Sequence, residues 1–167
     1  VSWGPAYFIE VHGLSSAKSG FYSSLIFIGF MIGSPVLNIL SDRYNKRKFF
    51  MYISTFASIL LASLLIFINV SALNAAIIFS LIGFTTSCFV ISYSVIKENY
   101  QIAMVGTAIG FMNMCNNLFD ANSVYISGKS MQINAELDPI NMYNIAFLSI
   151  FICLILSMIP LKLLKAR

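Results

Sequence analysis

Long apolar stretches joined by short connections limit the possible folds of this chain more than any other feature. There are five such stretches, at residues 22–40, 49–69, 73–96, 102–125 and 143–161. Four of them are almost wholly apolar, and the stretch at 102–125 also carries amides and one acid. A helix rises about 1.5 Å per residue, so roughly 20 residues cross the hydrocarbon layer of a bilayer. Because lipid offers no partner to backbone groups, such stretches must be helical. The sequence therefore predicts an all-α integral membrane protein.

Residues 1–9 are also apolar and aromatic, but they are too few to cross a membrane. We expect them to be the end of a further helix, so that the chain holds five full transmembrane helices and the last turns of a sixth. The composition agrees, since 59% of the residues are hydrophobic and 10% are charged, against about 25% charged in soluble domains. Residues 1–167 are thus predicted to form a single membrane domain.

The basic residues are distributed unevenly between the two sides that these helices define. Short connections make neighbouring helices antiparallel, so alternate connections lie on the same side of the membrane. Lys18 and Lys129 fall on one side, and eight basic residues fall on the other: Arg43, Lys46, Arg47, Lys48, Lys97, Lys162, Lys165 and Arg167. Connections rich in Lys and Arg stay in the cytoplasm, which predicts a cytoplasmic 41–48 connection and C-terminus. Because this charge collects at the ends of apolar stretches, we do not expect nucleic-acid binding.

The chain lacks the residue combinations on which enzymes, metal sites and cofactor sites depend. Its one histidine, His12, lies in a predicted connection, and its three cysteines lie within apolar stretches without CxxC or metal spacing. No glycine-rich phosphate loop and no Ser/His/Asp set is present. We therefore expect free cysteines, no metal, no cofactor and no enzymatic activity.

Small residues recur four positions apart in two of the stretches. Gly29 and Gly33 form one pair, and Gly106 and Gly110 form another. Such pairs let helices approach closely, so both are predicted helix-packing sites. Pro35 follows the first pair and predicts a kink, which serves either as a hinge or as a packing adjustment.

The 102–125 stretch carries polar side chains on one helical face. Asn113, Asn116 or Asn117, and Asp120 recur there at helical spacing. A carboxylate within a membrane is costly and usually faces water or a partner. These residues are therefore candidates for contacting a substrate or carrying a proton. A protonated, hydrogen-bonded structural acid, or a position nearer the outer surface, are the alternative explanations of Asp120.

The connection with the most positive charge contains a recognisable motif. Residues 38–47 read NILSDRYNKR, which resembles the signature loop of the major facilitator superfamily, G-x-L-x-D-R-x-G-R-R/K. Asn38 and Asn45 replace the two glycines. Residues 3–5 (WGP) and 12–15 (HGLS) resemble the end of that family's seventh helix and its outer loop, and residues 106–113 (GTAIGFMN), after Glu98, resemble the start of its eleventh.

The resemblance implies a secondary transporter that moves a small solute by alternating access, with this chain as its C-terminal half, from the end of helix 7 to helix 12. It also implies a cytoplasmic gate of Asp42, Arg43 and Glu98, with Arg47 in support. From the residues alone, Glu98 is either a solvated charge or a partner of the basic cluster.

The resemblance further implies a set of partners and a location. The expected partners are the lipid bilayer, an unknown small solute, a coupling ion such as H⁺, and an N-terminal half that is missing from this chain. The expected location is a bacterial cytoplasmic (inner) membrane. The alternative is a truncated, non-transporting remnant, or a structural membrane subunit that pairs with another half.

Overall fold

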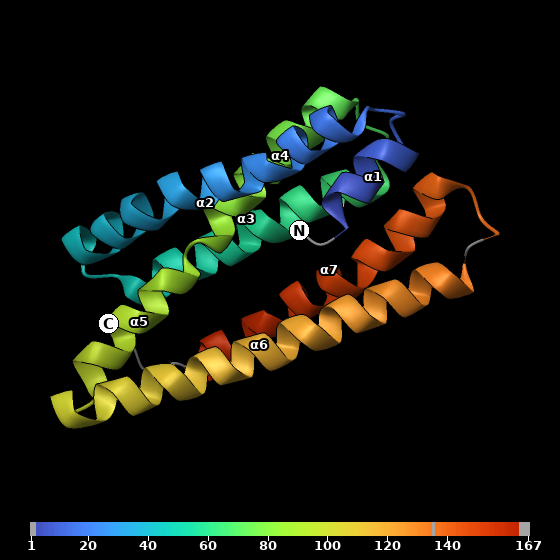
Figure 1. The fold of residues 1–167 in the computed structure, drawn as a ribbon. Coiled ribbons are helices and arrows are strands. Elements are labelled where there is room, and N and C mark those ends of the chain that lie inside the picture. The colour runs from blue at the N-terminus through green and yellow to red at the C-terminus, as the bar shows by residue number, and fades with distance from the viewer. Residues whose placement is uncertain (1–2, 135, 164–167) are drawn as a thin grey trace.

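The computed structural model describes residues 3–134 and 136–163, and this part of the chain is a bundle of α-helices without a strand (Figure 1). Counting α4 and α5 as one interrupted helix, five helices are long and apolar enough to cross a membrane. The predicted all-α membrane fold is therefore confirmed. The helices are α1 (Gly4–Glu10), α2 (Ser16–Tyr44), α3 (Arg47–Phe67), α4 (Ala72–Thr86), α5 (Phe89–Asn99), α6 (Ile102–Ile133) and α7 (Pro139–Leu163).

Two helices extend well past the apolar stretches that predicted them. α2 begins at Ser16 rather than at residue 22, and α6 ends at Ile133 rather than at residue 125. The apolar length reflects the thickness of the lipid, whereas a helix continues until its backbone is stopped. α2 stops at Asn45, whose φ of 50° is left-handed. The N–H of Asn45 then bonds the carbonyl of Asp42 at 3.1 Å, as is usual at a helix C-terminus.

The stretch predicted as one helix over 73–96 is interrupted at Ser87 and Cys88, between α4 and α5. The N–H of Cys88 bonds the carbonyl of Thr85 at 3.3 Å, which is the tighter spacing of a 3₁₀ turn. The hydroxyls of Thr86 and Ser87 also bond carbonyls one turn back, at 2.7 and 2.6 Å. Such hydroxyls compete with the helical ladder, and a hydropathy pattern does not detect this competition.

Glycines set the closest helix contact of the bundle, between α2 and α4. A Cβ on Gly29 would overlap the carbonyl oxygen of Ser80, and one on Gly83 would overlap that of Ile26. Gly33 meets the carbonyl of Phe84 in the same way. The first predicted glycine pair thus lies at a close contact of two backbones.

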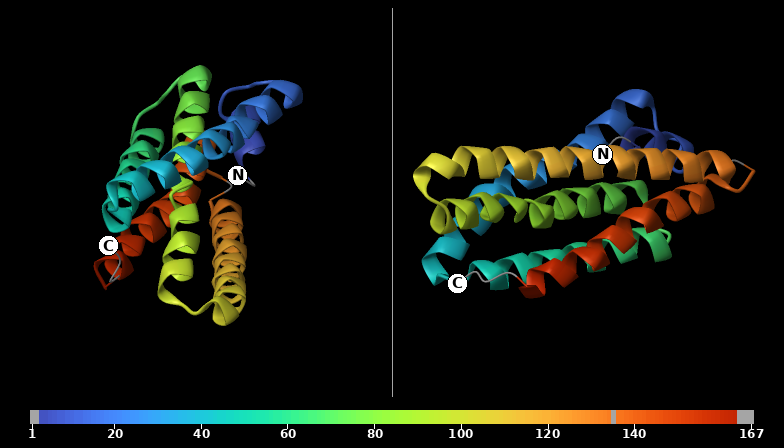
Figure 2. Two further views of the ribbon diagram at one scale, coloured as in Figure 1. Left: turned by 90° about the vertical axis from the view of Figure 1, so that its left-hand side faces the viewer. Right: turned by 90° about the horizontal axis from the view of Figure 1, so that it is seen from below.

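The second predicted pair does not join helices within the part of the chain that the structure describes. A Cβ on Gly106 or Gly110 would meet no described atom within 4 Å. The reason is the position of α6, which lies along one side of the bundle and contacts mainly α7 (Figure 2). In the most apolar 18-residue segment of α6 no residue is buried.

The apolar core lies toward the end of the bundle that holds α1. Phe8 is fully buried and Tyr7 is 5% exposed. The Tyr7 ring lies 6.2 Å from that of Phe79 on α4 and 5.5 Å from that of Tyr143 on α7. The short helix α1 therefore fills the space between the longer helices at this end.

Candidate functional site

Three charged side chains meet where α2 ends, α3 begins and α5 ends. Asp42 lies in the last turn of α2, Arg47 is the first residue of α3, and Glu98 is next to the last residue of α5. The turn at Asn45 reverses the chain and returns Arg47 to the side of Asp42. Glu98 is 51 residues from Arg47 in sequence. The packing of α5 against α2 and α3 brings it to the same place.

Arg47 is the centre of this group, which we call the Arg47 cluster. Its Nε and Nη2 donate to the two carboxylate oxygens of Glu98 at 2.9 and 2.6 Å, a bidentate pair. Its Nη1 lies 2.7 Å from Oδ1 of Asp42, an ion-pair contact without an aligned hydrogen bond. The side chain of Arg47 is 11% exposed, against 51% for Asp42 and 55% for Glu98. A nearly buried cation is therefore held by two half-exposed carboxylates.

The exposure of the two carboxylates limits the strength of each ion pair. Ion pairs in contact with water contribute only about 0–1 kcal/mol, because solvent screens them. Loss of one carboxylate nevertheless leaves Arg47 in a nearly buried place with half of its compensating charge. Arg47 keeps both carboxylate partners only while the three helix ends stay together.

Arg43, which we expected in this group, lies outside it. Arg43 is exposed, and among residues 3–134 and 136–163 it forms no ion pair. Successive helical residues are about 100° apart around the axis, so Asp42 turns toward α3 while Arg43 turns to solvent. The family resemblance implied Arg43 in the gate with Arg47 in support, whereas the reversal of the chain at Asn45 places Arg47 beside Asp42.

The predicted polar face of α6 does not converge on one site. Asn113 accepts a hydrogen bond from the hydroxyl of Tyr93 on α5 at 2.7 Å. Asn116 borders a hollow of about 550 Å³ between α3, the end of α4, α5, α6 and α7, and its Nδ2 atom is buried without a hydrogen-bond partner among the described residues. Asn117 and Asp120 are exposed. The first two amides therefore turn into the bundle, and the other two residues turn away from it.

Two hydroxyl residues on α5 take part in contacts that the sequence did not single out. One is Tyr93, which bonds Asn113. The other is Ser94, whose hydroxyl donates to Oδ1 of Asn38 at 3.3 Å and so connects α5 with α2 about one helical turn before Asp42. Asn38 occupies the first glycine position of the loop motif. Hydroxyls in membrane helices mostly bond their own backbone, so their presence alone gave no signal.

The apolar helices and the charged cluster at the helix ends define an integral membrane protein. The family model of the Major Facilitator Superfamily matches residues 1–121, and the chain belongs to this family. The function of the family is membrane transport, and the resemblance seen in the sequence is thereby confirmed. No curated protein and no solved structure gives a significant match.

Proposed function

We propose that residues 1–167 form the C-terminal half of a secondary transporter that moves a small solute across the cytoplasmic membrane by alternating access. The solute passes between this half and a second half-bundle, as in transporters built from paired repeats. A coupling ion such as H⁺ drives the movement. The Arg47 cluster latches the cytoplasmic side in one conformation and opens in the other.

The observation that carries this proposal is the bridge that Arg47 makes between three helix ends. Asp42 belongs to α2 and Glu98 to α5, so one guanidinium connects both with the start of α3. A small separation of these ends hydrates Arg47 and removes its contacts together. Such an ion network makes two arrangements of packed helices distinguishable in energy, which an alternating-access cycle requires.

The uncovered face of α6 supports the presence of a second half. Phe111 and Phe119 are 64% and 75% exposed, and Asp120 is exposed on the same helix. Lipid covers apolar rings but is a poor environment for a carboxylate. A protein surface with a hydrated path fits both kinds of side chain. The uncontacted glycines Gly106 and Gly110 would let a helix of that second half approach closely.

Thiol labelling in the full-length protein tests the latch without knowledge of the solute. All native cysteines, Cys88, Cys115 and Cys153 among them, are replaced by serine, and Asn117→Cys places one thiol on the exposed face of α6. Glu98→Gln removes half of the charge that holds Arg47, so we expect a membrane-impermeant maleimide to label this thiol several-fold faster in inside-out vesicles. In right-side-out vesicles the same variant should label more slowly.

Arg43→Gln is the matched control, because it also removes a charge from the cytoplasmic connection but breaks no ion pair of the described chain. A labelling rate that changes equally in both variants contradicts the latch. Labelling that is unaffected by Glu98→Gln on either side favours a structural subunit over a transporter.

A further inference from the structure

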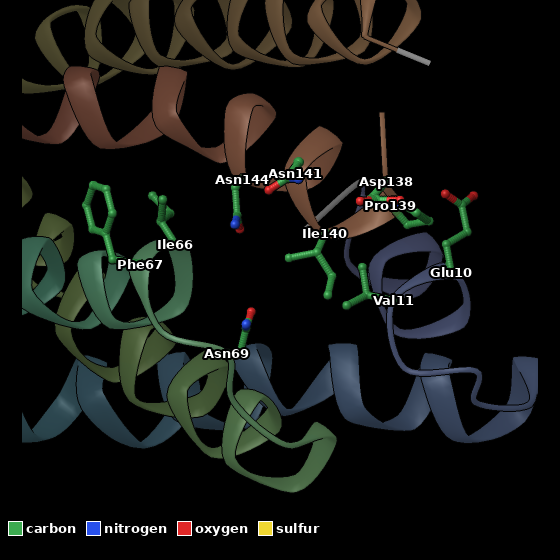
Figure 3. A pocket seen from close by; sticks show the side chains of 10 residues that line it. All are labelled: Glu10, Val11, Ile66, Phe67, Asn69, Asp138, Pro139, Ile140, Asn141 and Asn144. Atoms are coloured by element: carbon green, nitrogen blue, oxygen red, sulfur yellow. The ribbon is translucent and has the colours of Figure 1, made fainter. Parts of the chain in front are cut away.

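A hollow of about 560 Å³ (Figure 3) opens at the end of the bundle that holds α1, opposite the α2–α3 turn where the Arg47 cluster lies (Figure 1). It is bordered by the end of α1, by the end of α3 with the connection that follows it, and by the start of α7 with the residue that precedes it. No residue of α2, α4, α5 or α6 lines it. The hollow is therefore separate from the face of α6 along which we propose that the solute passes.

The chemistry of this hollow changes from one end to the other. Glu10 and Asp138 lie at one end and Phe67, which is 69% exposed, lies at the other (Figure 3). Three amide side chains lie between them: Asn69, Asn141 and Asn144. An acidic end, hydrogen-bonding groups and an aromatic surface thus follow one another within one space.

The carboxylate of Glu10 is oriented by a hydrogen bond from a buried side chain. The hydroxyl of Tyr143 donates to Oε2 of Glu10 at 3.1 Å. Tyr143 has no exposed surface and packs edge-on against the ring of Tyr7, with centroids 5.5 Å apart. A carboxylate oriented by a buried phenol keeps its second oxygen directed for a ligand at little entropic cost.

The polar groups of the hollow have few competing partners. Among the described residues, no Lys, Arg or His lines it, and neither Glu10 nor Asp138 forms an ion pair. The described residues also give the three amides no side-chain hydrogen bond across the hollow. Two uncompensated carboxylates repel an anion and attract a cation.

The size and lining of the hollow favour an organic cation over a metal ion. Calcium takes about six to eight oxygen ligands at close range, and the described residues contain no group of three or more acidic, His or Cys side chains that could hold a metal. An ammonium group needs fewer partners and is also attracted to an aromatic face.

We propose that this hollow binds an ammonium group, carried either by a soluble organic amine or by the headgroup of a phospholipid. The ammonium lies between Glu10 and Asp138 and the amides bind the polar part of the molecule. The body of a larger amine reaches Phe67 at the other end of the hollow.

Calorimetric titration of choline and ethanolamine tests the soluble source. The full-length protein is placed in nanodiscs of phosphatidylglycerol, which carries no amine. We expect saturable binding that becomes about tenfold weaker or more in Glu10→Gln and in Asp138→Asn, because each loses a charge-assisted contact. Glu136→Gln is the matched control, since Glu136 is an exposed acid of the same connection that does not line the hollow.

Lipid retention tests the other source. In nanodiscs that mix phosphatidylethanolamine with phosphatidylglycerol, mass spectrometry after detergent extraction measures which lipid stays bound. Selective retention of phosphatidylethanolamine that Glu10→Gln abolishes assigns the lipid headgroup, and amine binding without retention assigns a soluble amine. Absence of both, or an equal loss in Glu136→Gln, overturns the proposal. Unchanged melting temperatures of the variants show that the loss of binding is not a loss of folding.

Discussion

At the scale of single residues, the contact of α2 with α4 depends on the absence of a Cβ. Gly29 and Gly83 each face a carbonyl oxygen of the other helix rather than a side chain. A flexible side chain can move aside, but a backbone carbonyl within a helix moves only with its helix. The two glycines therefore determine the distance between the helices, and this distance also positions the start of α5 and so Glu98.

Gly29→Ala should destabilise the protein. The added methyl group would overlap the carbonyl of Ser80, and overpacking of this kind costs about 1–3 kcal/mol. We expect a lower melting temperature of the purified protein in detergent. Gly20→Ala is the control on the same helix, because a Cβ there meets nothing within 4 Å, and it should leave the melting temperature unchanged or raise it. Equal melting temperatures for the two variants would show that α2 and α4 can separate freely.

At the scale of elements, the sequence predicted which stretches are helical but not how the helices end. Apolar length and charge identified the spans, because these properties act through the bilayer and not through particular neighbours. The turn at Ser87 and Cys88 depends on hydroxyls that bond their own helix. The end of α2 depends on one left-handed residue, Asn45. The first is a local backbone event within a run whose hydropathy hardly changes, and the second depends on one backbone conformation inside a charged connection.

Asn45 offers a direct test of the α2–α3 turn. Asn45→Gly should be neutral or slightly stabilising, because glycine adopts the observed φ of 50° without strain. Asn45→Val should cost about 1–2 kcal/mol, because a β-branched residue resists the left-handed conformation. The measurement is the melting temperature of each variant, which should be lower for Asn45→Val than for Asn45→Gly. If valine were tolerated as well as glycine, the turn would not require this conformation and Arg47 would not depend on it for its position.

The candidate site shows the same division between what could and could not be predicted. The loop motif identified Asp42 because it is a local pattern. Whether Glu98 is solvated or paired depends on the packing of α5 on α3. Its partner Arg47 is 51 residues away in sequence. The contact of Tyr93 with Asn113 likewise joins two helices. A single sequence carries no information on such distances unless a motif contains them.

At the scale of the whole molecule, the two ends of the bundle differ in charge. One end carries the Arg47 cluster and its neighbouring basic residues, and the other carries Glu10, Asp138 and the hollow between α1, α3 and α7. Basic residues are retained on the cytoplasmic side by the positive-inside rule and by anionic lipids, whereas acidic residues have little influence on orientation. This difference predicts that the Arg47 cluster faces the cytoplasm and the acidic hollow faces outward.

Two single-cysteine variants test this orientation in a background without the native cysteines. Lys46→Cys lies in the α2–α3 turn and Glu136→Cys in the α6–α7 connection, and both positions are exposed. We expect a membrane-impermeant maleimide to label only Glu136→Cys in intact cells and only Lys46→Cys in inside-out vesicles. Permeabilised cells, in which both should react, control for reactivity. The reverse pattern would place the Arg47 cluster outside, and the cluster would then latch the outer side of the solute path.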